Sequence, residues 1–144
     1  MNRTFLICLL VVLGGGHWLL KRELASAEAR GRTLELGEST FDGRVLDSSK
    51  SVMIHFWAPG CAPCKRVAPY VNQLADEVGR DALVGTVNID RHPVLAQRYG
   101  VKQTPRFVIF RDGKVVDEFG GKVVKRFGGA SKAYLYGRLE GYIY

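Results

Sequence analysis

The sequence predicts an α/β fold in which a central mixed β-sheet is flanked by helices, and three observations support this prediction. Segments with the period of a strand alternate with segments of helical period between residues 32 and 100. A β-hairpin signal follows over residues 105–119. The chain has 144 residues, 47% of them hydrophobic, which is enough for one ordinary core. One domain is therefore expected.

The first expected elements are a weak strand at residues 32–36 and a short helix at residues 40–46. Ser51–Trp57 has apolar side chains on both of its faces, as a strand in the middle of a sheet does. Apolar residues then recur at helical spacing from Val67 until Gly79, which can end a helix. These segments predict the pattern strand, helix, strand, helix.

The second half continues with a strand over Asp81–Asp90. Asp90 is expected to cap a short helix with Pro93 in its first turn. Asp112-Gly113 separates two apolar runs and predicts the tight turn of a hairpin. A last helix is expected over residues 130–143.

An eight-residue segment is duplicated: Gly113–Gly120 reads GKVVDEFG and Gly121–Gly128 reads GKVVKRFG. Two copies of so short a unit do not make a solenoid. We expect the second copy to add an edge strand after a turn at Gly120-Gly121, with basic residues that discourage aggregation between sheet edges. A basic edge that docks an acidic partner is the alternative.

The distribution of charge argues against a nucleic-acid-binding protein. The formal net charge is +7, but residues 28–120 hold 13 basic and 12 acidic groups. Residues 121–144 hold five basic groups and one acidic group. A phosphate-binding face needs a denser basic cluster with aromatic or amide readers beside it. We therefore expect a solvated basic C-terminal surface and no nucleic-acid partner.

The first 27 residues have the outline of an export signal. Arg3 precedes an apolar run over Phe5–Leu13, and Ala25-Ser26-Ala27 has the small residues that a signal peptidase accepts. However, the apolar stretch continues to Leu20, and Lys21-Arg22-Glu23 puts charge just before the cleavage site. The segment is therefore a signal peptide or an uncleaved membrane anchor, with a cytoplasmic orientation or a wrong start codon as the remaining alternatives.

The predicted organisation is a signal peptide or membrane anchor at residues 1–27, a linker at residues 28–33 and a folded domain at residues 34–144. A domain behind such a segment works outside the cytoplasm, so a periplasmic location, secreted or anchored, is expected. Cleavage after Ala27 removes Cys8, and two of the three cysteines then remain.

Those two cysteines form the only Cys-x-x-Cys motif of the chain, Cys61 and Cys64, between a buried strand and the start of a helix. Two thiols at this spacing can close into a small disulfide. The first thiol meets the unpaired amides and the positive end of the helix, which favour the attacking thiolate form. We therefore expect Cys61 to attack a target disulfide and Cys64 to resolve the mixed disulfide, with no metal or organic cofactor.

Two other interpretations of the cysteine pair are weaker. A structural zinc site uses four ligands, whereas this chain offers one cysteine pair with His55 and His92 as isolated additions. A purely structural disulfide that closes so short a loop contributes little stability. Redox chemistry is therefore the favoured interpretation.

The residues around the motif closely resemble the thioredoxin family. The matching segments, in the family's order and spacing, are FWAPGCAPCK at residues 56–65, Ala68-Pro69, VNID at residues 87–90, Tyr99-Gly100-Val101 and Thr104-Pro105. The resemblance covers about residues 34–144 and implies the thioredoxin fold, a lowered pKa of the first cysteine, and a buried Trp57 beside the disulfide. It also implies a cis peptide bond at Thr104-Pro105, in a turn that faces the disulfide and binds the substrate segment.

The sequence departs from the family near the cysteines. His55 stands where the family has a buried aspartate that handles the proton of the second cysteine, and Thr86 replaces the lysine commonly paired with it. Because a histidine titrates near neutrality, His55 is the candidate replacement proton acceptor, and a neutral core histidine is the alternative. Gly60 replaces a large aromatic residue before Cys61, which opens the substrate surface.

Ala62 and Pro63 stand in place of the usual Gly-Pro between the cysteines, and together with Lys65 they are expected to tune the pair. Proline before the second cysteine resembles the reducing branch of the family. The resemblance thus implies a monomeric reductase of disulfide-containing exported proteins, recharged by a membrane or soluble electron donor. A weak oxidase or isomerase, and a binding module with incidental redox activity, are the alternatives.

Overall fold

The computed structural model describes residues 33–120 and 131–143, which lie within a compact unit running from Gly31 to Tyr144. Five strands, four α-helices and one π-helical turn make up this described part. In chain order they are β1 (Leu34–Glu35), α2 (Glu38–Phe41), η1 (Asp42–Leu46), β2 (Ser51–Trp57), α3 (Ala62–Val78), β3 (Ala82–Asn88), α4 (Pro93–Arg98), β4 (Arg106–Arg111), β5 (Lys114–Gly120) and α6 (Lys132–Glu140). None of the described helices is long and apolar enough to cross a membrane.

The five described strands form one mixed sheet in the order β1-β3-β2-β4-β5. The first three strands in this order run parallel, and β4 and β5 run antiparallel to their neighbours. Parallel neighbours need a crossover connection, which α3 provides between β2 and β3. The hairpin of β4 and β5 turns at Asp112 and Gly113, which have positive φ angles of 50° and 71°. The predicted mixed sheet and its hairpin are therefore confirmed.

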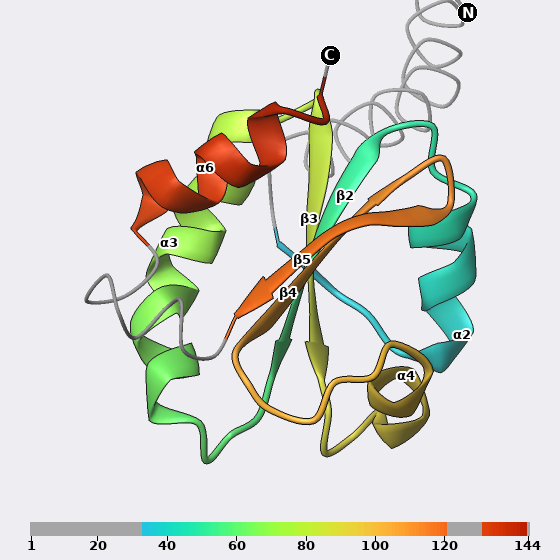
Figure 1. Ribbon diagram of the computed structural model, residues 1–144, viewed down its shortest axis with the longest axis vertical. Helices are drawn as coiled ribbons and strands as arrows, with labels where there is room; N and C mark the ends of the chain where they lie inside the picture. The colour runs from blue at the N-terminus through green and yellow to red at the C-terminus, as the bar shows by residue number, and fades with distance from the viewer. Residues whose placement is uncertain (1–32, 121–130, 144) are drawn as a thin grey trace, which may run out of the picture. The chain divides into compact units, whose positions relative to one another are not determined.

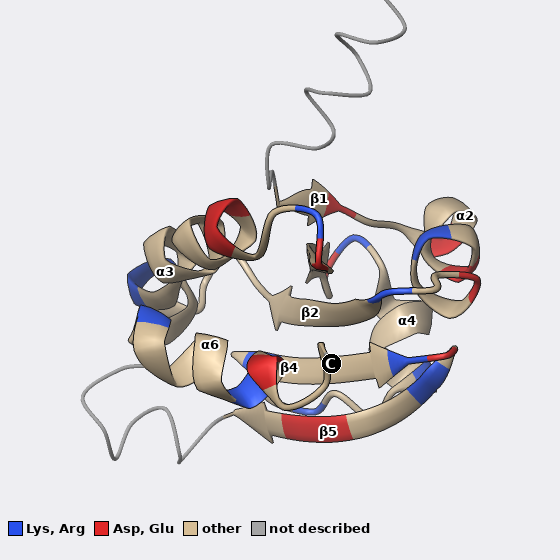
Figure 2. Ribbon diagram, turned by 90° about the horizontal axis from the view of Figure 1, so that it is seen from above, with Lys and Arg blue, Asp and Glu red and all other residues tan. Residues whose placement is uncertain are grey.

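Helices cover both faces of the sheet. Seen along the sheet, α3 and α6 lie on one face and α2 and α4 on the other (Figure 1; Figure 2). β2 lies in the middle of the sheet and is buried from Ser51 to Phe56, as its two apolar faces predicted. Met53 belongs to the core under α3 and α6, and Ile54 belongs to the core under α2 and α4. The end of β2 is thus fixed from both sides, and the cysteine motif follows directly after it.

The C-terminal helix is tied to the sheet by hydrogen bonds from two strands. The hydroxyl of Ser51, at the start of β2, and the guanidinium of Arg111, at the end of β4, both donate to the carbonyl of Tyr142. At the other end of α6, the hydroxyl of Ser131 accepts a hydrogen bond from the amide of Tyr134 at 3.2 Å, which caps the helix. These bonds hold α6 over the same face of the sheet as α3.

Several predicted details differ in the structure. The helix expected at residues 40–46 is an α-helical turn, α2, followed by the π-helical turn η1. Asp90 does not cap α4: the N-cap position is His92, whose side chain makes no capping bond. The amide of Asp90 instead donates to the side chain of Asn88 at 3.0 Å, within the turn after β3. The strand expected from Gly121–Gly128 lies outside the described residues.

Candidate active site

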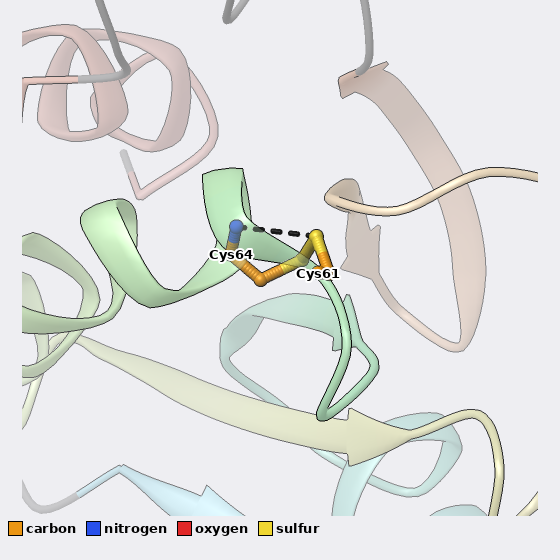
Figure 3. Close-up of a disulfide and its surroundings, with 2 residues drawn as sticks. All are labelled: Cys61 and Cys64. Atoms are coloured by element: carbon orange, nitrogen blue, oxygen red, sulfur yellow. Dashed lines mark hydrogen bonds between the residues drawn. A yellow bond between two sulfur atoms is a disulfide. The ribbon is translucent and has the colours of Figure 1, made fainter.

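Cys61 and Cys64 lie where the chain enters α3 after leaving β2 (Figure 3). Their sulfur atoms form a disulfide, and their Cα atoms are 5.2 Å apart. Cys61 is the N-cap of the helix, and its Sγ accepts a hydrogen bond from the amide of Cys64 at 3.2 Å. The amide of Cys61 donates to the carbonyl of Ala58 at 3.0 Å, which holds the turn before the helix. The sulfur of Cys61 therefore lies at the positive end of a 17-residue helix, where negative charge is stabilised.

The two cysteines differ in exposure. Cys64 is buried, with 2% of its surface exposed, whereas Cys61 is half-buried. Ala62 and Pro63 fill the first two positions of the helix, where an amide has no partner within the helix and proline is tolerated. Lys65 is exposed on the first turn of α3. A large substrate can therefore reach Cys61, while Cys64 is placed to attack the sulfur of Cys61 after Cys61 has bonded to a target.

The predicted cis peptide bond is present between Thr104 and Pro105. Pro105 is buried and Thr104 is half-buried, immediately before β4. Arg106, the first residue of β4, pairs with Phe56 near the end of β2. Because β2 and β4 are antiparallel, the end of one strand lies beside the start of the other. The cis-proline turn and the cysteine motif therefore share one edge of the sheet, as the sequence predicted.

Gly120, at the end of β5, is a site residue that the sequence analysis missed. It pairs with Arg106 and has a φ angle of 154°. A Cβ atom at this position would come within 2.3 Å of the carbonyl oxygen of Pro105. Only glycine allows so close an approach of the two backbones. A glycine within a strand was the available signal, because it often marks such a contact.

Trp57 ends β2, and Gly60 lies in the turn that leads to Cys61. Trp57 was expected to be buried, but it is half-buried, because β2 ends there and its side chain lines a cavity at the edge of the core. Its carbonyl accepts a hydrogen bond from Ile89 at 2.9 Å. Gly60 is exposed, and a Cβ atom there would meet no described atom within 4 Å. The surface before Cys61 is thus open, as predicted.

The cavity lies behind the disulfide and has a volume of about 250 Å³. Cys64 and His55 both line it. His55 is 2% exposed, and its ring stacks on Phe107 with centroids 4.7 Å apart and planes 11° apart. Its Nε2 atom is buried and has no hydrogen-bond partner among the described residues. Burial lowers the pKa of His55 to about 4, because a charged imidazolium loses its hydration there.

The neutral His55 ring is able to accept a proton but not to keep it. At pH 7 an imidazole with a pKa of about 4 is almost entirely unprotonated. The ring therefore does not stabilise a thiolate by carrying a standing positive charge. Its unpartnered Nε2 atom belongs to a residue that lines the same cavity as Cys64.

A disulfide between one accessible and one buried cysteine at the start of a helix is the arrangement of a thiol–disulfide oxidoreductase. The family model for thioredoxin matches residues 32–127. The chain belongs to the thioredoxin family, whose members act on disulfide-bearing proteins.

Known relatives and a solved structure agree with this assignment. The chain is 38% identical over 88 residues to a thioredoxin of Chlorobaculum thiosulfatiphilum, a match that covers 61% of this chain and 82% of the relative. It is 42% identical over 80 residues to thioredoxin 1 of Synechococcus elongatus, covering 56% and 75% of the two chains. The structure of a mutant thioredoxin from Halobacterium salinarum superposes with a TM-score of 0.68 at 29% identity, covering 80% of this chain and 94% of the other. The thioredoxin fold is therefore confirmed.

Proposed function

We propose that this protein reduces disulfides of exported proteins, with Cys61 as the attacking and Cys64 as the resolving cysteine. The difference in exposure between the two cysteines carries this assignment. Cys61 is half-buried at the helix start, and Cys64 is 2% exposed behind it. The proline before Cys64 supports the reducing direction, since it is typical of the reducing branch of the family.

The reaction proceeds by two displacements. The Cys61 thiolate attacks one sulfur of the target disulfide, so a Cys61–target bond forms and the other target sulfur leaves as a thiolate. The sulfur of Cys64 then attacks Cys61, the Cys61–Cys64 bond forms, and the second target sulfur leaves with the electron pair. Two electrons thus pass from the dithiol to the target, and the two target thiolates take up protons from solvent. His55 accepts the proton of Cys64 during the second displacement.

The target binds at the sheet edge that holds both the motif and the cis-proline turn. Thr104 and Pro105 offer backbone groups to an extended target segment, and Trp57 borders the motif on the other side. Gly60, where a side chain would meet open space, leaves room for a bulky residue of the target beside its disulfide. The protein acts as a monomer in this proposal.

The proposed location is outside the cytoplasm, secreted or anchored by residues 1–27. The charged start, the apolar run and the small residues at 25–27 support it. A membrane or soluble electron donor then returns the Cys61–Cys64 disulfide to the dithiol after each turnover. Protease digestion of intact cells, of cells with only the outer barrier opened, and of lysed cells tests the location. A domain outside the inner membrane is digested once the outer barrier is opened, whereas a cytoplasmic domain is digested only after lysis.

The reduction potential tests the proposed direction. The full-length protein with Cys8→Ser is equilibrated in dithiothreitol or glutathione buffers, and the free thiols of Cys61 and Cys64 are labelled and counted. A value of about −270 mV supports a reductase. A value of about −120 mV would overturn the proposed direction in favour of an oxidase. Cys64→Ser should trap a mixed disulfide with a target protein, whereas Cys61→Ser should trap none. A Cys61→Ala, Cys64→Ala double variant that keeps its role in cells would point to a binding module instead.

A further inference from the structure

Three polar residues from three strands lie side by side on the face of the sheet under α3. In the strand pairing, His55 of β2 is opposite Thr86 of β3, and Thr86 is opposite Glu35 of β1. Neighbouring strands are about 4.8 Å apart, so the three residues form a row across the sheet. All three side chains line the cavity behind the disulfide, which confirms that they point to the same face.

The two ends of this polar row differ in their exposure to solvent. At its inner end, the cavity is lined by Cys64 and by His55, whose Nε2 atom has no partner among the described residues. At its outer end, the side chain of Glu35 is 65% exposed. Thr86 is half-buried between them, and its hydroxyl can both donate and accept a hydrogen bond. The cavity has a volume of about 250 Å³ and a mainly apolar lining, so a bridging water would have its partners at these side chains and at Lys65 and Asn72.

On the other side of His55, the neighbouring strands β4 and β5 place apolar rings at the corresponding positions. Phe107 of β4 stacks on the His55 ring, and Phe119 of β5 stacks on Phe107 with centroids 5.1 Å apart. Neither ring can carry a proton. Across the strands, the polar neighbours of His55 therefore lie on the side of Thr86 and Glu35, and Lys65 and Asn72 of α3 line the same cavity.

We propose that Thr86 and Glu35 form a proton relay that carries the proton of Cys64 from His55 to solvent. The proposal rests on the proposed function, since it concerns the second displacement of that reaction. The Cys64 sulfur attacks Cys61 while its proton passes to Nε2 of His55, and the target thiolate leaves. His55 then gives a proton through Thr86 or a bridging water to the Glu35 carboxylate, which releases it to solvent. His55 returns to the neutral form, so no charge stays buried.

Two basic residues face this path from neighbouring elements. Lys65 of α3 lines the cavity, and Arg91, after β3, lies 3.8 Å from the Glu35 carboxylate. Both members of the Arg91–Glu35 pair are well exposed, so water screens the pair strongly. Burial is what disfavours a lasting charge on His55, so a proton taken up there needs an exit.

The experiment separates the two displacements in one trace. Fully reduced full-length protein carrying Cys8→Ser is mixed with dithiobis(nitrobenzoate) by stopped flow, and the release of thionitrobenzoate is followed by absorbance. The first release reports attack by Cys61 and scales with reagent concentration. The second release reports resolution by Cys64 and does not. The relay affects only the second rate.

Thr86→Val removes the hydroxyl at nearly constant volume, and we expect it to slow the second release about tenfold at pH 7, while Thr86→Ser restores the rate. Glu35→Gln should slow it by a similar factor and should recover in the presence of added formate or acetate. Glu77→Gln removes another exposed carboxylate that forms an ion pair, with Lys132, and should leave both rates unchanged. Arg91→Gln removes the partner of Glu35 but not the carboxylate, and should also leave both rates unchanged.

The outcomes distinguish the relay from the function on which it rests. An unchanged second rate in both Thr86→Val and Glu35→Gln would overturn the relay, even if Thr86→Val alone is unstable. A second rate equally slow in Thr86→Ser and Thr86→Val would show a structural role for Thr86 and would also overturn it. Absence of the first release in the parent protein would refute the oxidoreductase proposal instead.

Discussion

The two faces of the sheet are covered by helices in similar ways, but they are packed differently. Under α2 and α4, the rings of Phe41, Tyr99 and Phe110 are in mutual contact, with centroids 5.2 to 5.7 Å apart. Under α3, a cavity of about 250 Å³ remains beside His55. The α3 face has its own stack of Phe107 and Phe119, but it leaves this cavity unfilled beside Cys64. The reactive cysteine pair and the unfilled space therefore belong to the same face of the sheet.

The largest expected change in stability comes from the ring cluster under α2 and α4. Phe41 is 0% exposed and contacts both Tyr99 and Phe110. Phe41→Ala should lower the free energy of unfolding by about 3–5 kcal/mol, because it removes buried surface and leaves a void in a rigid cluster. Urea unfolding of the full-length protein measures this loss. The reduction potential should stay within a few millivolts of the parent value, and a large change in potential would contradict the separation of this cluster from the reactive face.

His55 should make the stability of the other face depend on pH. Its pKa is about 4 in the folded protein and about 6.5 when unfolded. The unfolded chain therefore binds the proton first as the pH falls, and stability is lost between about pH 6.5 and pH 4. The shift corresponds to about 3 kcal/mol, all of it present above pH 6.5.

The non-titrating variant His55→Gln provides the comparison. Unfolding by urea is measured at several values between pH 7 and pH 4 for both proteins, so that the other titrating groups cancel in the difference. The parent should lose more stability than the variant over this range. Equal losses in the two proteins would show that His55 is not buried in its neutral form.

The fold and the central chemistry could be predicted because short, continuous sequence patterns indicate them. The alternation of β2, the cysteine spacing and Thr104-Pro105 each occupy a few consecutive residues. Contacts set by strand pairing could not be predicted in this way. Glu35, Thr86 and His55 are distant in the sequence, and only the register of three strands brings them into one row.

Three further details could not be predicted from a single residue type. The close approach of Gly120 to Pro105 depends on how β5 pairs with β4, so the glycine alone did not reveal it. The half-exposure of Trp57 depends on a cavity between α3 and the sheet, which no local pattern records. Asp90 has the residue type of a helix cap, but the turn at Asn88 uses its amide and the helix begins later.

The smallest expected change in stability tests whether α3 is packed less tightly beside the cavity than it is further along the helix. Ala68 lines the cavity, and Ala75, one heptad later on α3, is 2% exposed in the packed core. Ala68→Leu should fill part of the cavity and raise the free energy of unfolding by about 1 kcal/mol. Ala75→Leu makes the same chemical change where no space exists and should lower it by about 1–3 kcal/mol.

The same pair of variants connects packing to reactivity. If water in the cavity helps to carry the proton, Ala68→Leu should slow the second thionitrobenzoate release although the protein is more stable, since the leucine displaces that water. Ala75→Leu should leave this rate unchanged although the protein is less stable. Equal stability changes in the two variants would mean that the two parts of the α3 face are packed alike. A gain in stability without a slower second release would mean that protons pass directly between the side chains of the row.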